Sequence, residues 1–200
     1  MIDGPFREKL PHYVQPLLRF YRFIRISPNQ VTLTGAFFGL LSAYLVYQSL
    51  FVTAVACWWL GRLFDGTDGI YARSLNRASH FGAFLDINLD MLIYSVMIIA
   101  FSLIFPEHMI NWLIILFLYI MCTTGALSLG QFKRNKSESR DNRGIKLTAG
   151  IAEGGETGLA YTAFLLFPQF IHILSNGWII ILSTTVLARF VLAYKELHHD

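Results

Sequence analysis

The sequence predicts an all-α, polytopic membrane protein with six transmembrane helices and an N-terminal amphipathic interfacial helix. Composition is the first observation, since 54% of the 200 residues are hydrophobic and only 14% are charged. A soluble domain carries about 25% charged residues. The second observation is that the apolar residues form runs about 20 residues long, the length at which a helix crosses a hydrocarbon core of about 30 Å.

We expect residues 1–200 to form a single membrane domain, with an interfacial helix in 1–30 and a six-helix bundle in 31–200. Arginines and lysines alternate with apolar and aromatic residues through the N-terminal segment. That pattern is typical of an amphipathic helix lying in the membrane surface, with its basic face toward anionic headgroups. A cytosolic helix packed on the protein would show the same pattern, so this alternative stays open.

Six apolar stretches separated by polar or proline-containing breaks predict the membrane spans. The predicted spans are 31–48, 50–71, 81–105, 109–129, 148–167 and 171–194. Ser27, Pro28 and Asn29 predict the cap and start of the first span. Gly35 and Gly39 lie one helical turn apart within it, a spacing that suits close helix contact.

The distribution of Lys and Arg predicts the orientation in the membrane. All 16 lie in the N-terminal segment, the junction between spans two and three, the loop at 131–147, or the inner ends of spans two and six. The positive-inside rule therefore places both termini on the cytoplasmic side. We expect an integral protein of a bacterial-type inner or plasma membrane. The net charge of +3 reflects this inner rim and is no argument for nucleic-acid binding.

Four aspartates stand at the junction of the second and third spans. Asp65 and Asp68 are three residues apart, and Asp86 and Asp90 are four apart, so each pair projects from one helix face. One Asp at the centre of a membrane helix costs roughly 2.5–3.5 kcal/mol even on lenient scales. A divalent cation bound between two helices would offset that cost. Carboxylate oxygens suit Mg²⁺ or Mn²⁺ rather than zinc.

Glycines and an arginine beside the aspartates indicate a phosphate ligand. Gly66, Gly69 and Gly82 remove side chains where a ligand could approach the backbone. Arg73 offers a planar fork for a phosphate group. Because Mg²⁺ usually partners substrate phosphates, the sequence predicts a metal–diphosphate site at the cytoplasmic membrane face.

Other interpretations of the aspartates remain open. An ion-pair network with Arg62, Arg73 and Arg77 would explain their burial but not the glycine spacing. An intramembrane prenyltransferase also uses a metal and a diphosphate, but it would need more spans and two separate aspartate clusters. An intramembrane cation transporter would show an inverted repeat, and residues 1–100 show no similarity to 101–200.

The motif resembles the signature of the CDP-alcohol phosphotransferase family, the CDP-diacylglycerol:alcohol phosphatidyltransferases. That signature is D-x2-D-G-x2-A-R-x8-G-x3-D-x3-D. This chain has every fixed position: Asp65, Asp68, Gly69, Ala72, Arg73, Gly82, Asp86 and Asp90. The resemblance extends to the six-span layout, the N-terminal helix and Pro28-Asn29-x-x-Thr32 before the first span, so it covers most of the chain.

The resemblance implies a phospholipid-synthesising enzyme. It would transfer a phosphatidyl group from CDP-diacylglycerol to the hydroxyl of a small polar alcohol and release CMP. Asp65, Asp68 and Asp86 would ligate a pair of Mg²⁺ or Mn²⁺ ions, and Asp90 would be a ligand of the second ion and the general base. The resemblance implies CDP contacts from six residues: Pro28, Asn29, Thr32, Gly69, Arg73 and Ser79. It also implies a homodimer. Within the family, the alternative is a choline- or ethanolamine-type CDP donor with diacylglycerol as the acceptor.

The acceptor is expected to contact the start of the fifth span. Resembling enzymes with phosphorylated acceptors carry arginines there, in a pattern like GIAxRxER, whereas this chain has GIAEGGET with Gly154 and Thr157 at those positions. The difference argues against inositol phosphate or glycerol phosphate. We expect Glu153 and Glu156 to line the pocket of an acceptor with an amine or neutral hydroxyls. Alternatively, the glutamates pair with basic side chains: Lys133, Arg134 or Lys146.

Overall fold

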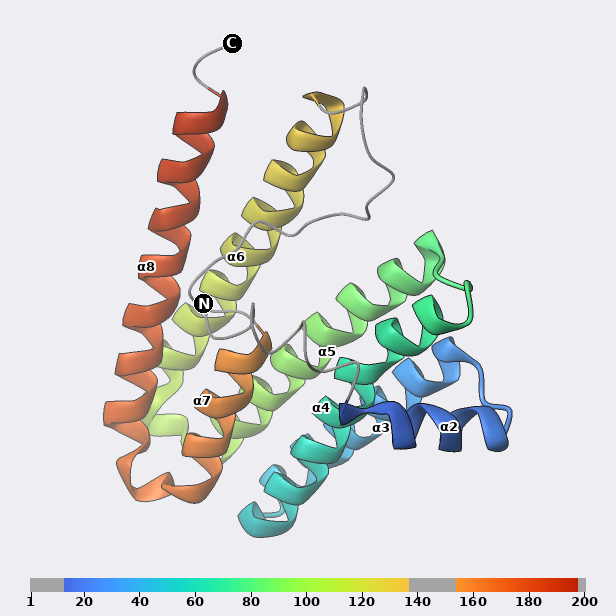
Figure 1. Cartoon of the computed structure of the whole chain (residues 1–200). Coiled ribbons are helices and arrows are strands. Elements are labelled where there is room, and N and C mark those ends of the chain that lie inside the picture. The colour runs from blue at the N-terminus through green and yellow to red at the C-terminus, as the bar shows by residue number, and fades with distance from the viewer. Residues whose placement is uncertain (1–12, 137–153, 198–200) are drawn as a thin grey trace.

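The computed structural model describes residues 13–136 and 154–197, and this part of the chain is helical without strands (Figure 1). The helices are α2 (Gln15–Phe23), α3 (Pro28–Tyr47), α4 (Phe51–Ser74), α5 (His80–Ile104), α6 (Met109–Lys136), α7 (Gly154–Leu166) and α8 (Ile171–Leu197). Short 3-10 turns, η1 (Pro106–His108) and η2 (Pro168–Phe170), precede α6 and α8. Helix α3 packs against both α4 and α5, α6 packs along α8, and α7 packs against α4.

Local sequence signals explain where two of these helices begin. Ser27 caps α3 by accepting a hydrogen bond from the Gln30 backbone, and the Gln30 side chain accepts one from the Ser27 backbone in return. Pro28 occupies the first turn of α3, as predicted. Ser79 caps α5 through a 3.0 Å hydrogen bond from the Gly82 backbone N–H. These caps fix the ends of α3 and α5 that flank the aspartates.

Glycines allow α3 and α4 to cross backbone to backbone. A Cβ atom on Gly35 would lie 3.1 Å from the Gly61 carbonyl oxygen, and one on Gly61 would lie 3.0 Å from the Gly35 carbonyl oxygen. A Cβ on Gly39 would lie 2.8 Å from Ile93 of α5. The close contact predicted for Gly35 and Gly39 is therefore confirmed, and it brings α3, α4 and α5 together beside the aspartates.

Gly61→Ala is expected to destabilise the protein by about 1–3 kcal/mol, because the added methyl meets backbone atoms that cannot rotate away. Gly125→Ala on α6 is the matched control, since nothing lies within 4 Å of its Cβ position. Alanine is the better helix former, so the control should be neutral or slightly stabilising. Melting temperatures of the two variants in detergent test the difference, and equal melting temperatures would contradict the crossing.

An aromatic core holds α7 against α4 and α5. Trp58 of α4 donates a 3.1 Å hydrogen bond to the Gly158 carbonyl of α7. Tyr161 of α7 donates a 2.9 Å bond to the Tyr94 carbonyl of α5. The rings of Trp58, Tyr94 and Tyr161 contact one another, and all three side chains are buried. This packing places the start of α7 next to the aspartate-bearing helices.

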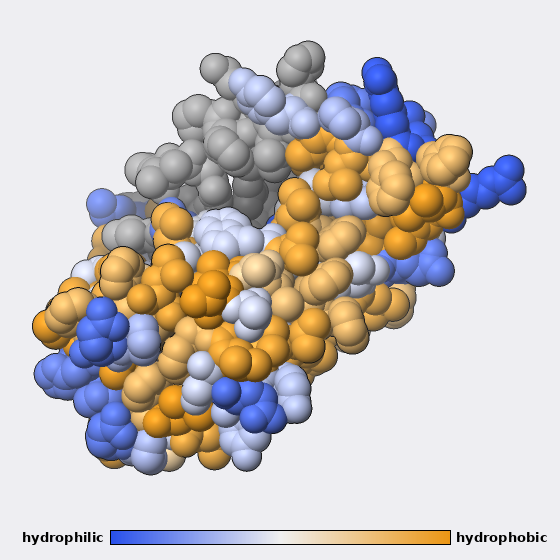
Figure 2. Space-filling model, turned by 90° about the horizontal axis from the view of Figure 1, so that it is seen from below, coloured by the Kyte–Doolittle hydropathy of each residue, from blue (hydrophilic) through white to orange (hydrophobic). Residues whose placement is uncertain are grey.

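Four segments of the described chain are long and apolar enough to cross a membrane: Pro28–Tyr47, His80–Ile104, Pro106–Phe132 and Pro168–Lys195. Large apolar side chains are exposed at helical spacing, as in Ile110, Leu113, Phe117 and Ile120 of α6. The face shown in Figure 2 is largely apolar, with hydrophilic residues gathered toward its margins. Burial in a lipid bilayer explains such a surface.

Helix α2 packs on α4. Leu18 and Tyr21 are buried, and the Tyr21 hydroxyl lies 3.1 Å from the Thr67 hydroxyl of α4. Phe20 and Phe23 are exposed. Helix α2 therefore contacts the rest of the protein, as the alternative of a helix packed on the protein requires. Its other side exposes aromatic residues. Residues 1–12 of the predicted interfacial helix lie outside the described residues.

Candidate active site

Helices α4 and α5 bring three of the four aspartates together. Asp65, Asp86 and Asp90 each offer a carboxylate oxygen within 4.8 Å of the others. All three side chains are partly exposed and so reachable by a ligand. A triad of carboxylate oxygens is a donor set that suits Mg²⁺ or Mn²⁺. The residues present therefore fit a divalent cation.

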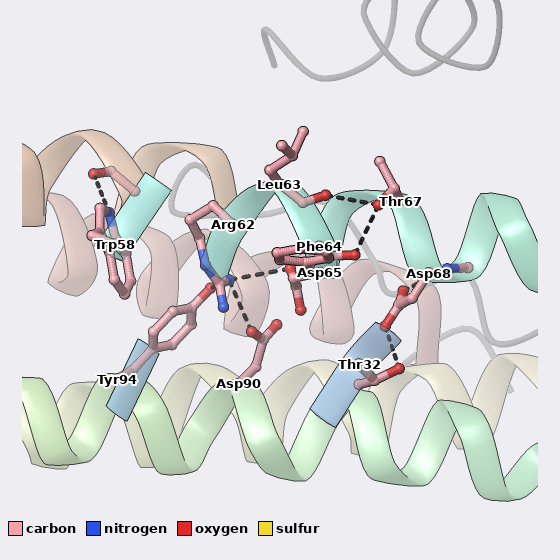
Figure 3. Close-up of polar contacts among 12 residues, drawn as sticks. Thr32, Trp58, Arg62, Leu63, Phe64, Asp65, Thr67, Asp68, Asp90 and Tyr94 are labelled. Atoms are coloured by element: carbon pink, nitrogen blue, oxygen red, sulfur yellow. Dashed lines mark hydrogen bonds and ion pairs between the residues drawn. The ribbon is translucent and has the colours of Figure 1, made fainter. Parts of the chain in front are cut away.

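Asp68 faces a different neighbour. One of its oxygens accepts a 2.5 Å hydrogen bond from the Thr32 hydroxyl of α3, and the other accepts one from the Gly69 backbone N–H. Figure 3 shows Asp68 beside Thr32, apart from Asp65 and Asp90. The side chain is only 6% exposed. Asp68 thus connects α4 to the start of α3 and lies outside the group of three aspartates.

The residues expected to contact CDP gather at one end of three helices. Pro28, Asn29 and Thr32 lie in the first turns of α3, Gly69 and Arg73 near the end of α4, and Ser79 at the cap of α5. A Cβ on Gly82 would lie 3.3 Å from the Ser79 hydroxyl and 3.4 Å from the Asn29 side-chain oxygen.

The glycines of the motif differ in what surrounds them. A Cβ on Gly69 would lie 3.2 Å from a guanidinium nitrogen of Arg73, so the glycine makes room for that side chain. Nothing lies within 4 Å of the Cβ position of Gly66. The open space predicted beside the motif is thus present at Gly66, whereas Arg73 fills it at Gly69.

Arg62 joins the aspartate cluster, which the motif did not indicate. Its Nη1 donates to Asp90 Oδ1 at 2.9 Å and to the Tyr94 hydroxyl at 3.0 Å, and lies 3.2 Å from Asp65 Oδ2 (Figure 3). The alternative interpretation is therefore correct for Arg62. Its position one helical turn before Asp65 was the available signal. The pairing and the triad coexist, since each carboxylate has two oxygens.

The start of α7 lies next to this cluster. A Cβ on Gly154 would lie 3.6 Å from the Tyr94 hydroxyl, which accepts the hydrogen bond from Arg62. Glu156 lies in the first turn of α7 and is partly buried. Glu153, the other residue expected to contact the acceptor, lies outside the described residues. The α7 segment that differs from GIAxRxER thus adjoins the aspartates.

Comparison with known families confirms the resemblance. The model of the family described as CDP-alcohol phosphatidyltransferase matches residues 25–190. The inner membrane protein YnjF of Escherichia coli is 29% identical over 84% of this chain and 83% of its own length. Shorter matches cover less than half of each relative. They are to an uncharacterised protein of Aquifex aeolicus, 38% identical over 43% of this chain and 42% of that protein, and to archaetidylinositol phosphate synthase of Pyrococcus horikoshii, 35% identical over 41% and 45%.

Solved structures of Mycobacterium tuberculosis phosphatidylinositol phosphate synthase PgsA1 share the fold. The structure in complex with manganese and citrate has a TM-score of 0.71 at 19% sequence identity, and the comparison covers 90% of this chain and 88% of that one. The structure with CDP-DAG bound has a TM-score of 0.65 at 19% identity, covering 90% and 92%.

Proposed function

Since the chain belongs to the CDP-alcohol phosphatidyltransferase family, we propose that it transfers a phosphatidyl group from CDP-diacylglycerol to the hydroxyl of a small polar alcohol, releasing CMP. The chain is a phosphotransferase of phospholipid biosynthesis. The observation that carries the proposal is the triad of Asp65, Asp86 and Asp90 within 4.8 Å, beside the helix ends that hold the expected CDP contacts. PgsA1 structures with CDP-DAG bound and with manganese support this donor and this kind of metal.

The aspartates would hold two Mg²⁺ or Mn²⁺ ions. Asp65, Asp86 and Asp90 supply the clustered oxygens, and Asp68, fixed by Thr32 and Gly69, is the fourth proposed ligand. When bound, the ions neutralise the diphosphate and polarise its β-phosphorus.

The chain's own residues orient the donor and move the proton. Asn29, Arg73 and Ser79 contact the CDP moiety from the ends of α3, α4 and α5, together with Pro28, Thr32 and Gly69. Asp90 accepts the proton of the acceptor hydroxyl. That oxygen bonds to the β-phosphorus in line, the bond from this phosphorus to the bridging oxygen breaks, and CMP leaves.

The topology proposed for this enzyme has six spans in one domain. Four of the proposed spans are the segments that are long and apolar enough to cross a membrane. Helices α4 and α7 are the other two proposed spans, because α4 packs against both α3 and α7 within the bundle. With these spans, all Lys and Arg would lie on one side of the membrane. By the positive-inside rule, the active site and both termini would then face the cytoplasm of a bacterial-type inner membrane. Helix α2 lies in that interface, where the exposed Phe20 and Phe23 reach lipid.

Cysteine labelling tests this topology. Glu107→Cys in η1 should react with a membrane-impermeant reagent from outside intact cells, and Arg77→Cys between α4 and α5 should react only after permeabilisation. Both native positions are exposed, so access to the reagent is not limited by packing. Labelling of both positions from the same side would refute the six-span arrangement.

The activity is tested with purified protein, labelled CDP-diacylglycerol, Mg²⁺ and a panel of alcohols. We expect CMP release that depends on one alcohol, with a phospholipid as the second product. A parallel reaction with CDP-choline, CDP-ethanolamine and diacylglycerol tests the family alternative. Transfer in that reaction alone would overturn the proposed donor. Chemical crosslinking of the same preparation tests the homodimer.

Glu156→Gln is expected to raise the acceptor KM by about tenfold and to leave the KM for CDP-diacylglycerol unchanged. The reason is that Glu156 lies in the first turn of α7, whose first residue, Gly154, lies next to Tyr94. The residues proposed to contact CDP lie on α3, α4 and α5 instead. Glu107→Gln, an exposed glutamate in η1, is the matched control. A variant that raises only the donor KM would show that the acceptor pocket lies elsewhere.

A further inference from the structure

Arg62 is the cation that the structure places inside the aspartate cluster. Its side chain is 9% exposed, and the Asp65 and Asp90 side chains are 24% and 25% exposed. One nitrogen, Nη1, serves both carboxylates and the Tyr94 hydroxyl. Nε and Nη2 are buried and have no hydrogen-bond partner among the described residues. A buried guanidinium with two nitrogens that have no hydrogen-bond partner is costly unless its charge is needed.

Two aromatic rings fix the position of that charge. The Arg62 guanidinium carbon lies 5.1 Å from the centre of the Trp58 ring and 5.3 Å from the centre of the Tyr94 ring. Both rings are buried in the core, and Trp58 is tied to α7 through Gly158. These two cation–π contacts add to the ion pairs with Asp65 and Asp90 in holding the guanidinium beside the aspartates.

A fixed positive charge beside two carboxylates changes what the cluster can bind. Asp65 and Asp90 attract a divalent cation, and Arg62, 3.2 Å and 2.9 Å from them, offsets part of that attraction and repels the ion. The negative diphosphate of the donor restores the attraction, because Mg²⁺ usually binds together with substrate phosphates. Arg62 thereby makes metal binding depend on the donor.

We propose that Arg62 is a resident counter-ion that keeps the affinity of the protein alone for a divalent cation low, so that metal and CDP-diacylglycerol bind together. This inference rests on the proposed metal-dependent function. Arg62 is a positioning residue in it, because it acts through Asp65 and Asp90 rather than on the substrate.

Mn²⁺ binding provides the test. Free Mn²⁺ is measured by electron paramagnetic resonance during titration of the purified protein, with and without CDP-diacylglycerol. Arg62→Gln removes the charge, Arg62→Met removes it while keeping an apolar stem between the two rings, and Arg62→Lys retains it. Arg77→Gln, which removes an exposed arginine after α4, is the matched control for net charge.

The expected result is that Arg62→Gln and Arg62→Met bind Mn²⁺ at least about tenfold more tightly than the wild type without donor. CDP-diacylglycerol should then increase Mn²⁺ affinity less than it does in the wild type, since the coupling is reciprocal. Arg62→Lys and Arg77→Gln should stay within about threefold of the wild type. Added Mn²⁺ should raise the melting temperature more in the tighter-binding variants than in the wild type. This comparison of each variant with and without Mn²⁺ works even for a variant whose own stability is reduced.

Two distinguishable outcomes would overturn the inference: one concerns Arg62 alone, and the other concerns the proposed metal site. Unchanged or weaker Mn²⁺ binding in Arg62→Gln and Arg62→Met, with a wild type that binds Mn²⁺ and donor together, would mean that Arg62 only holds the two carboxylates in place. Absence of Mn²⁺ binding in the wild type and all variants, even with CDP-diacylglycerol, would remove the proposed metal site itself.

Discussion

Asp90→Asn is expected to lower single-turnover CMP release by about 10²- to 10⁴-fold, the range that general-base assistance contributes. A primary alcohol is too weakly acidic to attack unaided at neutral pH. Asp90 lies on α5, one turn after Asp86 and one turn before Tyr94. The Tyr94 hydroxyl lies next to Gly154 at the start of α7. Asparagine keeps the shape and one oxygen ligand but cannot take the proton, so binding of CDP-diacylglycerol should persist.

Asp65→Asn is the control that separates loss of a metal ligand from loss of the general base. Asp65 belongs to the same oxygen triad but is proposed only as a ligand, so its loss should weaken donor affinity and turnover together. Donor affinity is measured by calorimetry with Mg²⁺ for both variants. If Asp90→Asn retains more than about a tenth of wild-type turnover, above what loss of a general base allows, the base is another residue and Asp90 is only a ligand.

Removal of divalent cations is expected to abolish CMP release. Excess EDTA should reduce activity to background, and added Mg²⁺ or Mn²⁺ should restore it, because three carboxylates within 4.8 Å need cations to bind a diphosphate. EDTA should also abolish binding of CDP-diacylglycerol. If the cations acted only in the chemical step, this binding would persist in EDTA.

Unfolding has to be separated from loss of metal in that experiment. Arg62 bridges Asp65 and Asp90, and the cores around Trp58 and Tyr161 do not involve the aspartates. Circular dichroism and the melting temperature in EDTA should therefore show a folded protein. Full CMP release in excess EDTA from a folded protein would remove the metal from the proposed mechanism.

The limits of most described helices could be predicted closely from the sequence. The exception is α6, which continues to Lys136, seven residues beyond the predicted end of the fourth span. Serine, proline and asparagine at positions 27–29 predicted the start of α3. The predicted break at Pro106 separates α5 from α6. The limits of α4 and α5 differ from the predicted spans by three residues or fewer at each end. These limits follow from local propensities, which a short window of sequence contains. The proposed count of six spans also depends on how the helices pack. Helix α4 carries charged residues of the site and is not among the segments that are apolar enough to be recognised as spans by composition.

The gathering of Asp65, Asp86 and Asp90 could also be expected from the sequence alone. The spacing of the motif places Asp65 near the end of one helix and the other two near the start of the next, joined by a short connection. Antiparallel neighbours of this kind face each other near the turn, so few arrangements keep these carboxylates apart.

Only the tertiary structure decided which neighbour each polar side chain meets. Asp68 accepts a hydrogen bond from Thr32, 36 residues away in the sequence, because α3 crosses α4 at Gly35 and Gly61. No local sequence pattern encodes that crossing. Arg62 meets Asp90 because the rings of Trp58 and Tyr94 hold it over α5. Such contacts depend on the rotation of each helix about its axis, which long-range packing sets and helical spacing alone leaves free.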